Sequence, residues 1–148
     1  MKISTKVECG IIALIDIAVN SDNDSVVKIN EISKRNNISA KYLEQIFPLL
    51  KQSSIIKSIK GASGGYILAR SSSEITLNEI VNALDNSILS ASTFNDKFEQ
   101  MAITAINECL WEPVTDFMCS FSENLTLKDL ADKFNELNSI HVEPMYYI

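Results

Sequence analysis

Three of the chain's four glycines lie within five residues, in the sequence GASGG at residues 61–65. Branched residues flank this cluster, with IIKSIK before it and YILAR at its end, and such residues favour β-strands. Glycine readily adopts the positive φ that tight turns need, so the pattern predicts a β-hairpin with a glycine-rich tip. Lys57 and Lys60 precede the tip and Arg70 follows it, so we expect a basic hairpin.

A phosphate-binding loop is the alternative interpretation of these glycines. A Walker loop requires Gly-Lys-Ser/Thr at the start of a helix, and a dinucleotide fingerprint requires its own glycine spacing. Here a strand-like pattern follows Gly65, which disfavours both. A hairpin that only packs against helices and contacts no nucleic acid stays open as a second alternative.

Helical patterns precede the hairpin. Apolar residues at helical spacing predict a first helix from about Thr5, where Thr5 and Glu8 match a capping box. A second helix is expected at residues 30–36, and Ser39 is the predicted N-cap of a third, AKYLEQIFPLLKQS, which Pro48 should bend. Two short helices joined by a loop of about four residues match a helix-turn-helix. With the basic hairpin, they predict a winged helix-turn-helix.

The second half of the chain predicts a long apolar helix. Thr76 and Glu79 match a capping box that opens LNEIVNAL, a polar linker follows at 85–96, and residues 97–122 have a helical pattern. Pro113 should kink that helix or sit in a break, and a last helix should start at Thr126. A winged domain is too small to cover so apolar a helix, so we expect a homodimer. The residues predicted to form its interface are Ile103, Ile106, Leu110, Val114 and Phe117.

The predicted fold class is therefore mainly α with a small β-hairpin wing. Residues 1–85 should form the winged helix-turn-helix DNA-binding domain, and residues 86–148 the linker, dimerisation helix, C-terminal helix and tail. Charge follows the same division: residues 1–70 carry ten Lys/Arg and six Asp/Glu, a net of +4, whereas residues 71–148 carry three and thirteen, a net of −10. The basic part suits phosphates, and the acidic part suits protein contacts or solvent.

Other classes of protein are disfavoured. No apolar run approaches the roughly 20 residues that span a bilayer, and MKISTKVE lacks the layout of a secretory signal, so we expect a cytoplasmic protein. Cys9, Cys109 and Cys119 show no CxxC spacing, which argues against a disulfide framework or a zinc ribbon. The chain has one histidine and no recognisable set of nucleophile, base and orienting group, so we predict that it is not an enzyme.

Four segments together resemble the Rrf-two, or BadM-type, family of bacterial winged-helix repressors: MKISTKVECGI, ISAKYLEQIFPLLKQSSIIKSIKGASGGYILAR, ITLNEIVNALD and LWEPVTDFMCSFSENLTLKDL. The most specific part is YLEQ followed by the wing pattern S-x-K-G-x-x-GGY-x-L. The resemblance implies a dimeric transcriptional regulator that binds double-stranded DNA at a pseudo-palindromic operator.

The resemblance also implies three groups of DNA-binding residues. The recognition helix would contribute Ser39, Lys41, Tyr42, Glu44 and Gln45. The wing would contribute Lys57, Ser58, Lys60, Gly61, Gly64 and Gly65. The start of the first helix would contribute Lys2, Ser4 and Lys6. Glu44 can accept a hydrogen bond from cytosine and Gln45 can pair with adenine, although an ordinary solvated helix face is the alternative for both.

Several members of this family hold an iron-sulfur cluster through three cysteines in and after the linker. The linker LSASTFNDKFEQ contains no cysteine, and the family's last cysteine and its nearby histidine align with Ala105 and Glu108. Cluster ligation normally requires four good ligands, so we predict no metal site and no cofactor. Two alternatives stay open, a cluster that uses Glu8, Cys9 and Cys109 across the dimer, and redox sensing by Cys9.

The chain's last residues, EPMYYI, are apolar, which suggests two roles. They could pack back on the long helix. Family members that regulate cysteine metabolism, however, also end in an aromatic residue followed by Tyr-Ile, and cysteine synthase accepts C-terminal isoleucines in its active site. The resemblance therefore implies that Tyr147 and Ile148 dock into cysteine synthase. An adaptor that works chiefly by protein binding, with weakened DNA binding, is the rival function.

Overall fold

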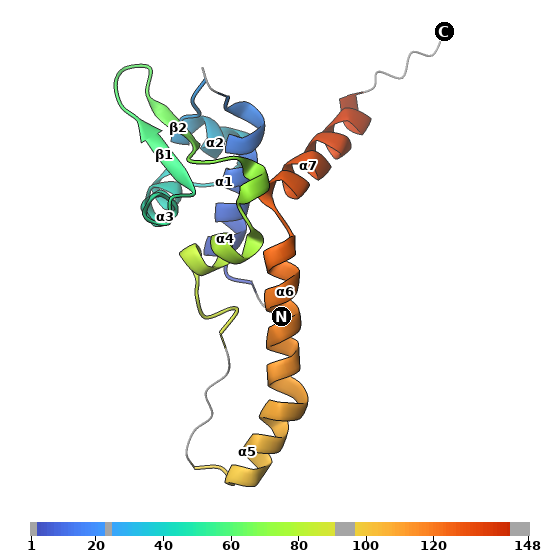
Figure 1. Ribbon diagram of the computed structural model, residues 1–148. Coiled ribbons are helices and arrows are strands. Elements are labelled where there is room, and N and C mark those ends of the chain that lie inside the picture. Colours follow the sequence, from blue (N-terminus) through green and yellow to red (C-terminus); the bar gives the residue numbers. More distant parts are fainter. Residues whose placement is uncertain (1–2, 23–24, 91–96, 143–148) are drawn as a thin grey trace.

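The computed structural model describes residues 3–22, 25–90 and 97–142. A helical head carries a two-stranded hairpin on one side, and a long helical rod leaves the head on another (Figure 1). The head consists of α1 (Thr5–Asn20), α2 (Ile29–Asn36), α3 (Ala40–Gln52), β1 (Ile56–Ile59), β2 (Gly65–Leu68), a 3₁₀ turn η1 (Ser72–Glu74) and α4 (Leu77–Leu84). The rod consists of α5 (Gln100–Ile106), a π-helical turn η2 (Asn107–Trp111) and α6 (Glu112–Asn124), after which α7 (Leu127–Val142) packs against α1.

The hydrophobic core lies inside the head. Each of the helices α1 to α4 buries one apolar face, and the first residue of α7, Leu127, is buried with them. The ring of Phe47 on α3 meets the ring of Tyr66 on β2 edge-on, with centroids 4.7 Å apart. Edge-to-face packing of this kind stabilises aromatic pairs, so the hairpin has a fixed position beside α3.

Side-chain caps define where the helices begin. The Ser39 hydroxyl accepts a hydrogen bond from the Tyr42 amide, which confirms Ser39 as the N-cap of α3. Thr76 and Glu79 form the predicted capping box of α4. The predicted cap of α1 is one residue off, because Ser4 caps the helix through the Val7 amide and Thr5 is its first helical residue.

The glycines of the hairpin are required by the chain's own geometry. Gly61 has a φ of 111°, which L-residues with side chains rarely adopt. A Cβ on Gly64 would lie 2.2 Å from the backbone oxygen of Ile59, and one on Gly65 would lie 2.7 Å from the oxygen of Val27. Val27 also exchanges two backbone hydrogen bonds with Tyr66, at 3.0 and 2.8 Å, and so adds a short bridge to β2. Gly64 and Gly65 are therefore required because nearby backbone oxygens leave no room for a Cβ atom.

We expect Gly64→Ala to distort the wing, because backbone atoms have no room for the new methyl group. The thermal midpoint should fall by several degrees, since about 1 kcal/mol corresponds to roughly 2–4 °C in a chain of this size. Ser63→Ala is the matched control, as Ser63 is exposed at the hairpin tip. Differential scanning calorimetry measures both variants, and equal midpoints for the two would contradict this view of the wing.

The rod is continuous, which resolves the two alternatives expected at Pro113. No break separates α5 from α6, and the wider turn η2 comes immediately before Glu112 and Pro113. Proline lacks an amide hydrogen, and its ring would clash with the carbonyl four residues earlier in a regular α-helix. A π-helical turn changes that spacing, which explains its position. The last helix continues five residues beyond its predicted extent, to Val142.

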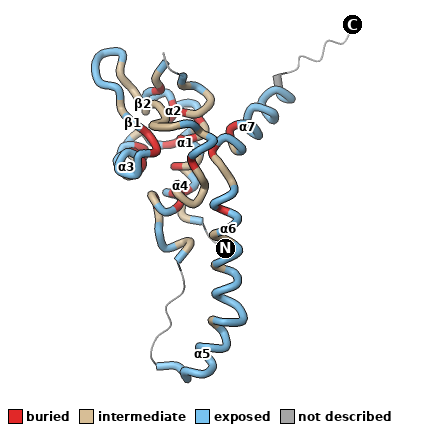
Figure 2. The backbone as a smooth tube through the Cα atoms, in the orientation of Figure 1, coloured by how far each residue is buried: buried red, intermediate tan, exposed pale blue. Residues whose placement is uncertain are grey.

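Most residues of the rod are exposed (Figure 2), and large apolar side chains are among them. Phe117 is 69% exposed, and Ile106, Leu110 and Val114 are between 42% and 47% exposed, whereas Ile103 is half-buried. Contiguous apolar surface of this kind usually marks an interface. These are the side chains that the sequence predicts at a dimer interface.

No helix within the described part of the chain has both the length and the apolar character needed to cross a bilayer.

Candidate nucleic-acid interface

Helix α3 presents a polar face to solvent. Its apolar side chains, including Leu43 and Phe47, are buried in the core. Lys41, Glu44 and Gln45 are exposed on the opposite side. Three of the predicted recognition-helix residues therefore share one accessible face that carries both donors and acceptors.

The other two predicted residues of this helix have structural roles. Ser39 is exposed, but its hydroxyl oxygen serves as the helix cap described above. Tyr42 is half-buried and packs against the core cluster. The structure thus brings Tyr42 only partly to the surface.

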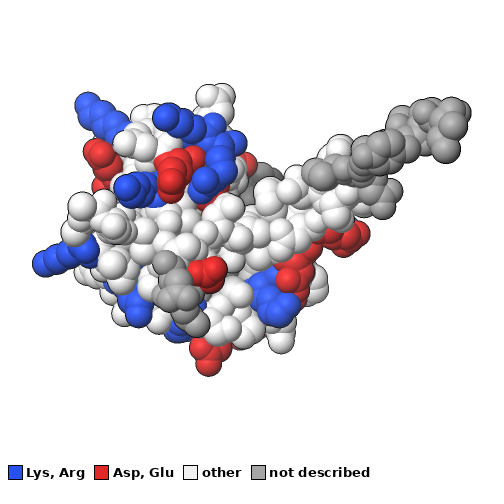
Figure 3. Space-filling view, turned by 90° about the horizontal axis from the view of Figure 1, so that it is seen from above, with Lys and Arg blue, Asp and Glu red and all other residues white. Residues whose placement is uncertain are grey.

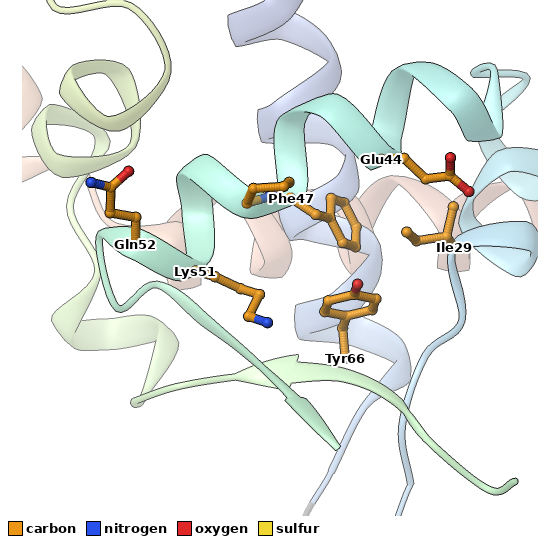
Figure 4. A pocket seen from close by; sticks show the side chains of 7 residues that line it. Ile29, Glu44, Phe47, Lys51, Gln52 and Tyr66 are labelled. Atoms are coloured by element: carbon orange, nitrogen blue, oxygen red, sulfur yellow. The ribbon is translucent and has the colours of Figure 1, made fainter. Parts of the chain in front are cut away.

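A groove of about 500 Å³ separates α3 from the hairpin (Figure 4). Glu44 and Lys51 extend from α3, and the packed rings of Phe47 and Tyr66 also line the groove. Lys51 is exposed, although it was not among the residues predicted to contact DNA. Its position seven residues after Glu44 was the available signal, because that spacing returns close to the same helical face.

The wing carries exposed cations. Lys57 on β1 and Lys60 at the start of the tip are both exposed, and neither forms an ion pair within the described residues. Ser58, Gly64 and Gly65 are half-buried. Figure 3 shows lysine and arginine side chains projecting around the head.

Arg70 has a different role from the one its position suggested. We expected it at the basic rim of the wing, but its Nη2 donates to Glu79 Oε1 at 2.6 Å and its Nη1 donates to the Glu74 carbonyl at 2.8 Å. Burial would raise the pKa of Glu79, but hydrogen bonds from Arg70 and Thr76 outweigh it, so the pKa is lowered. Arg70 therefore links the end of the hairpin to α4.

The start of α1 is the third predicted contact region. Ser4 caps the helix and Lys6 is exposed on its first turn, whereas Lys2 lies outside the described residues. Asp85 lies nearby: hydrogen bonds from Ser87 contribute most to lowering its pKa, and Ser4 and Lys6 contribute further. Lys6 therefore has an acidic neighbour, Asp85, at this end of α1.

The cysteines do not assemble a metal site in the described residues, where no group of three or more His, Cys, Asp or Glu side chains could hold a metal ion. Cys9 is half-buried in α1, and burial, followed by the charge of Glu8, raises the pKa of its thiol. A raised pKa reduces the thiolate fraction and therefore the reactivity. Cys109 is exposed on η2, while the half-buried Cys119 approaches the Leu89 carbonyl at 3.9 Å. That the protein holds no cofactor stays a prediction.

Comparison with known proteins gives consistent results. The sequence model of the Rrf2 family, described as an iron-dependent transcriptional regulator, matches residues 3–133. The HTH-type transcriptional regulator IscR of Escherichia coli O1:K1 is 30% identical over 132 residues, which cover 89% of this chain and 81% of that protein. Among solved structures, CymR, the global cysteine regulator of B. subtilis, has a TM-score of 0.76 at 30% identity, covering 90% of this chain and 98% of CymR. IscR of T. potens has a TM-score of 0.73 at 30% identity, covering 93% and 90% of the two chains. The predicted winged helix-turn-helix fold is confirmed.

Proposed function

This chain belongs to the Rrf2 family of transcriptional regulators, and on that basis we propose that it is a homodimeric repressor that binds double-stranded DNA. Its relatives named above are regulators and not enzymes. The observation that carries the proposal is the exposed face of α3 next to the unpaired lysines of the wing. An α-helix fits the major groove, where Glu44 and Gln45 can contact base edges, while Lys57 and Lys60 can contact phosphates.

A dimer is part of the proposal because of the rod. We assign DNA binding to residues 1–85 and dimerisation to residues 86–148. Two copies joined along the apolar surface of the rod would place two α3 helices on one DNA molecule. Such an arrangement matches a pseudo-palindromic operator with half-sites separated by about one helical turn, or a multiple of it.

A mobility-shift titration against the DNA upstream of the protein's own gene tests the function. We expect a discrete complex at nanomolar protein, and a shuffled fragment of equal length should bind at least about a thousandfold more weakly. Equal binding of the two fragments would contradict specific regulation. It would favour the rival function, an adaptor that works through its acidic half.

Lys60→Ala should weaken binding to that operator. The loss of one phosphate contact per subunit reduces the slope of log affinity against log salt by about one for each contact removed, or about two for the dimer. Lys133→Ala is the matched control, because it removes the same charge from α7, away from the wing. Fluorescence anisotropy between 50 and 200 mM salt measures both slopes. If Lys60→Ala and Lys133→Ala have the wild-type slope, the wing does not contact phosphates.

The regulated pathway is proposed to be cysteine supply. The likeness to CymR, a cysteine regulator, favours this pathway. Tyr147 and Ile148 lie outside the described residues, and their proposed role is to dock into cysteine synthase. An apolar residue with a carboxylate resembles an amino-acid substrate in its anionic group, which backbone donors can bind.

Deleting Ile148 should abolish synthase binding in calorimetry and leave dimerisation intact, whereas unchanged affinity would exclude this partner site.

A further inference from the structure

A second groove lies between α1, α2 and α7 and shares no lining residue with the groove beside α3. Its volume is about 720 Å³, which falls within the range of about 300–1,000 Å³ typical of small-molecule sites. Ile12, Ile15 and Phe134 form an apolar wall. Val19 adds to this wall and polar side chains of α1, α2 and α7 form the remainder, so the groove combines the two kinds of surface that ligand sites usually have.

A buried carboxylate fixes the polar part of this groove. Asp16 on α1 is only 6% exposed, and it accepts hydrogen bonds from Arg35 Nε at 2.9 Å and Arg35 Nη2 at 2.6 Å. The Asn36 amide donates to the same carboxylate at 2.7 Å. Because both carboxylate oxygens are engaged, the guanidinium is held in one orientation.

Further donors among the lining residues have no hydrogen-bond partner in the part of the chain that the structure describes. Arg35 Nη1 makes no hydrogen bond within the described residues, and the Arg35 side chain is 43% exposed. Asn135 and Asn138 line the groove from α7, and their side chains form no hydrogen bond to other described residues. Cationic and amide donors therefore line the same groove as the apolar side chains, while Asp16, the carboxylate among its lining residues, is already paired with Arg35.

We propose that this groove binds a small monocarboxylate with a compact apolar body. The carboxylate would accept hydrogen bonds from Arg35 Nη1 and the α7 amides, and the apolar body would lie against Ile12 and Phe134. Hydrogen bonds between ionised partners are roughly twice as strong as neutral ones, so a neutral analogue should bind less well. Arg35 belongs to α2, the first helix of the helix-turn-helix, so an occupant would contact the DNA-binding unit directly. An effect of this ligand on operator affinity rests on the proposed function, whereas binding of the ligand to the groove does not.

Nuclear magnetic resonance of the full-length, ¹⁵N-labelled protein tests this site. We would titrate it with 4-methylpentanoate and phenylacetate, and separately with the corresponding amides. At least one acid should shift the Arg35 Nε signal and the Asn135 and Asn138 side-chain signals saturably, with about tenfold higher affinity than its amide. The proposal is overturned if neither acid gives saturable shifts, or if acid and amide bind equally.

Asn138→Asp supplies a variant that leaves the Asp16–Arg35 pair in place. A negative charge at the rim should weaken acid binding at least about tenfold and leave amide binding unchanged. Lys133→Gln changes the net charge equally at a position on α7 that does not line the groove, and it should leave both affinities unchanged. Unaltered acid binding in Asn138→Asp would also overturn the proposal.

Discussion

Phe117→Glu is expected to convert the protein from a dimer to a monomer at micromolar concentration. Phe117 is 69% exposed in the single chain and lies one helical turn from Val114 on the rod. Its burial in a partner interface would contribute about 2 kcal/mol in each subunit, and a buried, unpaired carboxylate would add a further cost. A symmetric interface contains the change twice, so dissociation should become at least about a thousandfold more favourable. Sedimentation velocity measures the mass directly.

Ser120→Glu is the control for this experiment. Ser120 is exposed on the same helix, between the charged residues Asp116 and Glu123, so the variant adds equal charge beside existing acidic side chains and removes no apolar side chain. It should remain dimeric. A monomeric wild-type protein at micromolar concentration, or a Phe117→Glu variant that stays dimeric, would contradict the dimer and its proposed interface.

Arg35→Ala is expected to lower the free energy of unfolding by about 3 kcal/mol. The change leaves the Asp16 carboxylate buried without its cation, and removing one partner of a buried ion pair typically costs about 3–5 kcal/mol. The lower end applies because Arg35 is half-exposed and Asn36 still donates to the carboxylate. Urea denaturation, followed by circular dichroism, measures the difference.

A second substitution separates the charge from the packing. Asp16→Asn in the Arg35→Ala background removes the unpaired carboxylate and keeps a side chain of similar shape. Because the burial of an uncompensated charge is the main cost, the double variant should regain at least about 1 kcal/mol. A double variant less stable than Arg35→Ala would show that the carboxylate is not the source of the loss.

Local patterns in the sequence predicted most of the fold. Ser39 and the Thr76–Glu79 pair mark the starts of two helices through motifs only four residues long. The branched residues around Gly61 indicate the hairpin. Contacts between distant residues were not predicted. Asp16 and Arg35 are nineteen residues apart and belong to different helices, so no local spacing encodes their pairing.

The candidate interface was predicted only in part, because it also depends on contacts between distant residues. Lys57 is exposed because successive side chains of a strand point to opposite faces, and Lys60 is exposed because it lies in the turn after the strand. Arg70, in contrast, lies only a few residues from the tip, but tertiary packing places it against Glu79. Whether a charged side chain faces solvent or a partner depends on which helix packs beside it, and a single chain segment does not carry that information.

Selection from a random double-stranded DNA library with the purified, reduced protein tests the central claim most directly. The bound fraction is sequenced after several rounds of enrichment, with Lys60→Ala run in parallel under the same salt conditions. We predict a pseudo-palindromic motif whose half-sites are separated by about one helical turn or a multiple of it, and weaker enrichment of the same motif by the variant. A selected pool with no motif, or a motif without two-fold symmetry, would contradict a dimeric, sequence-specific DNA-binding regulator.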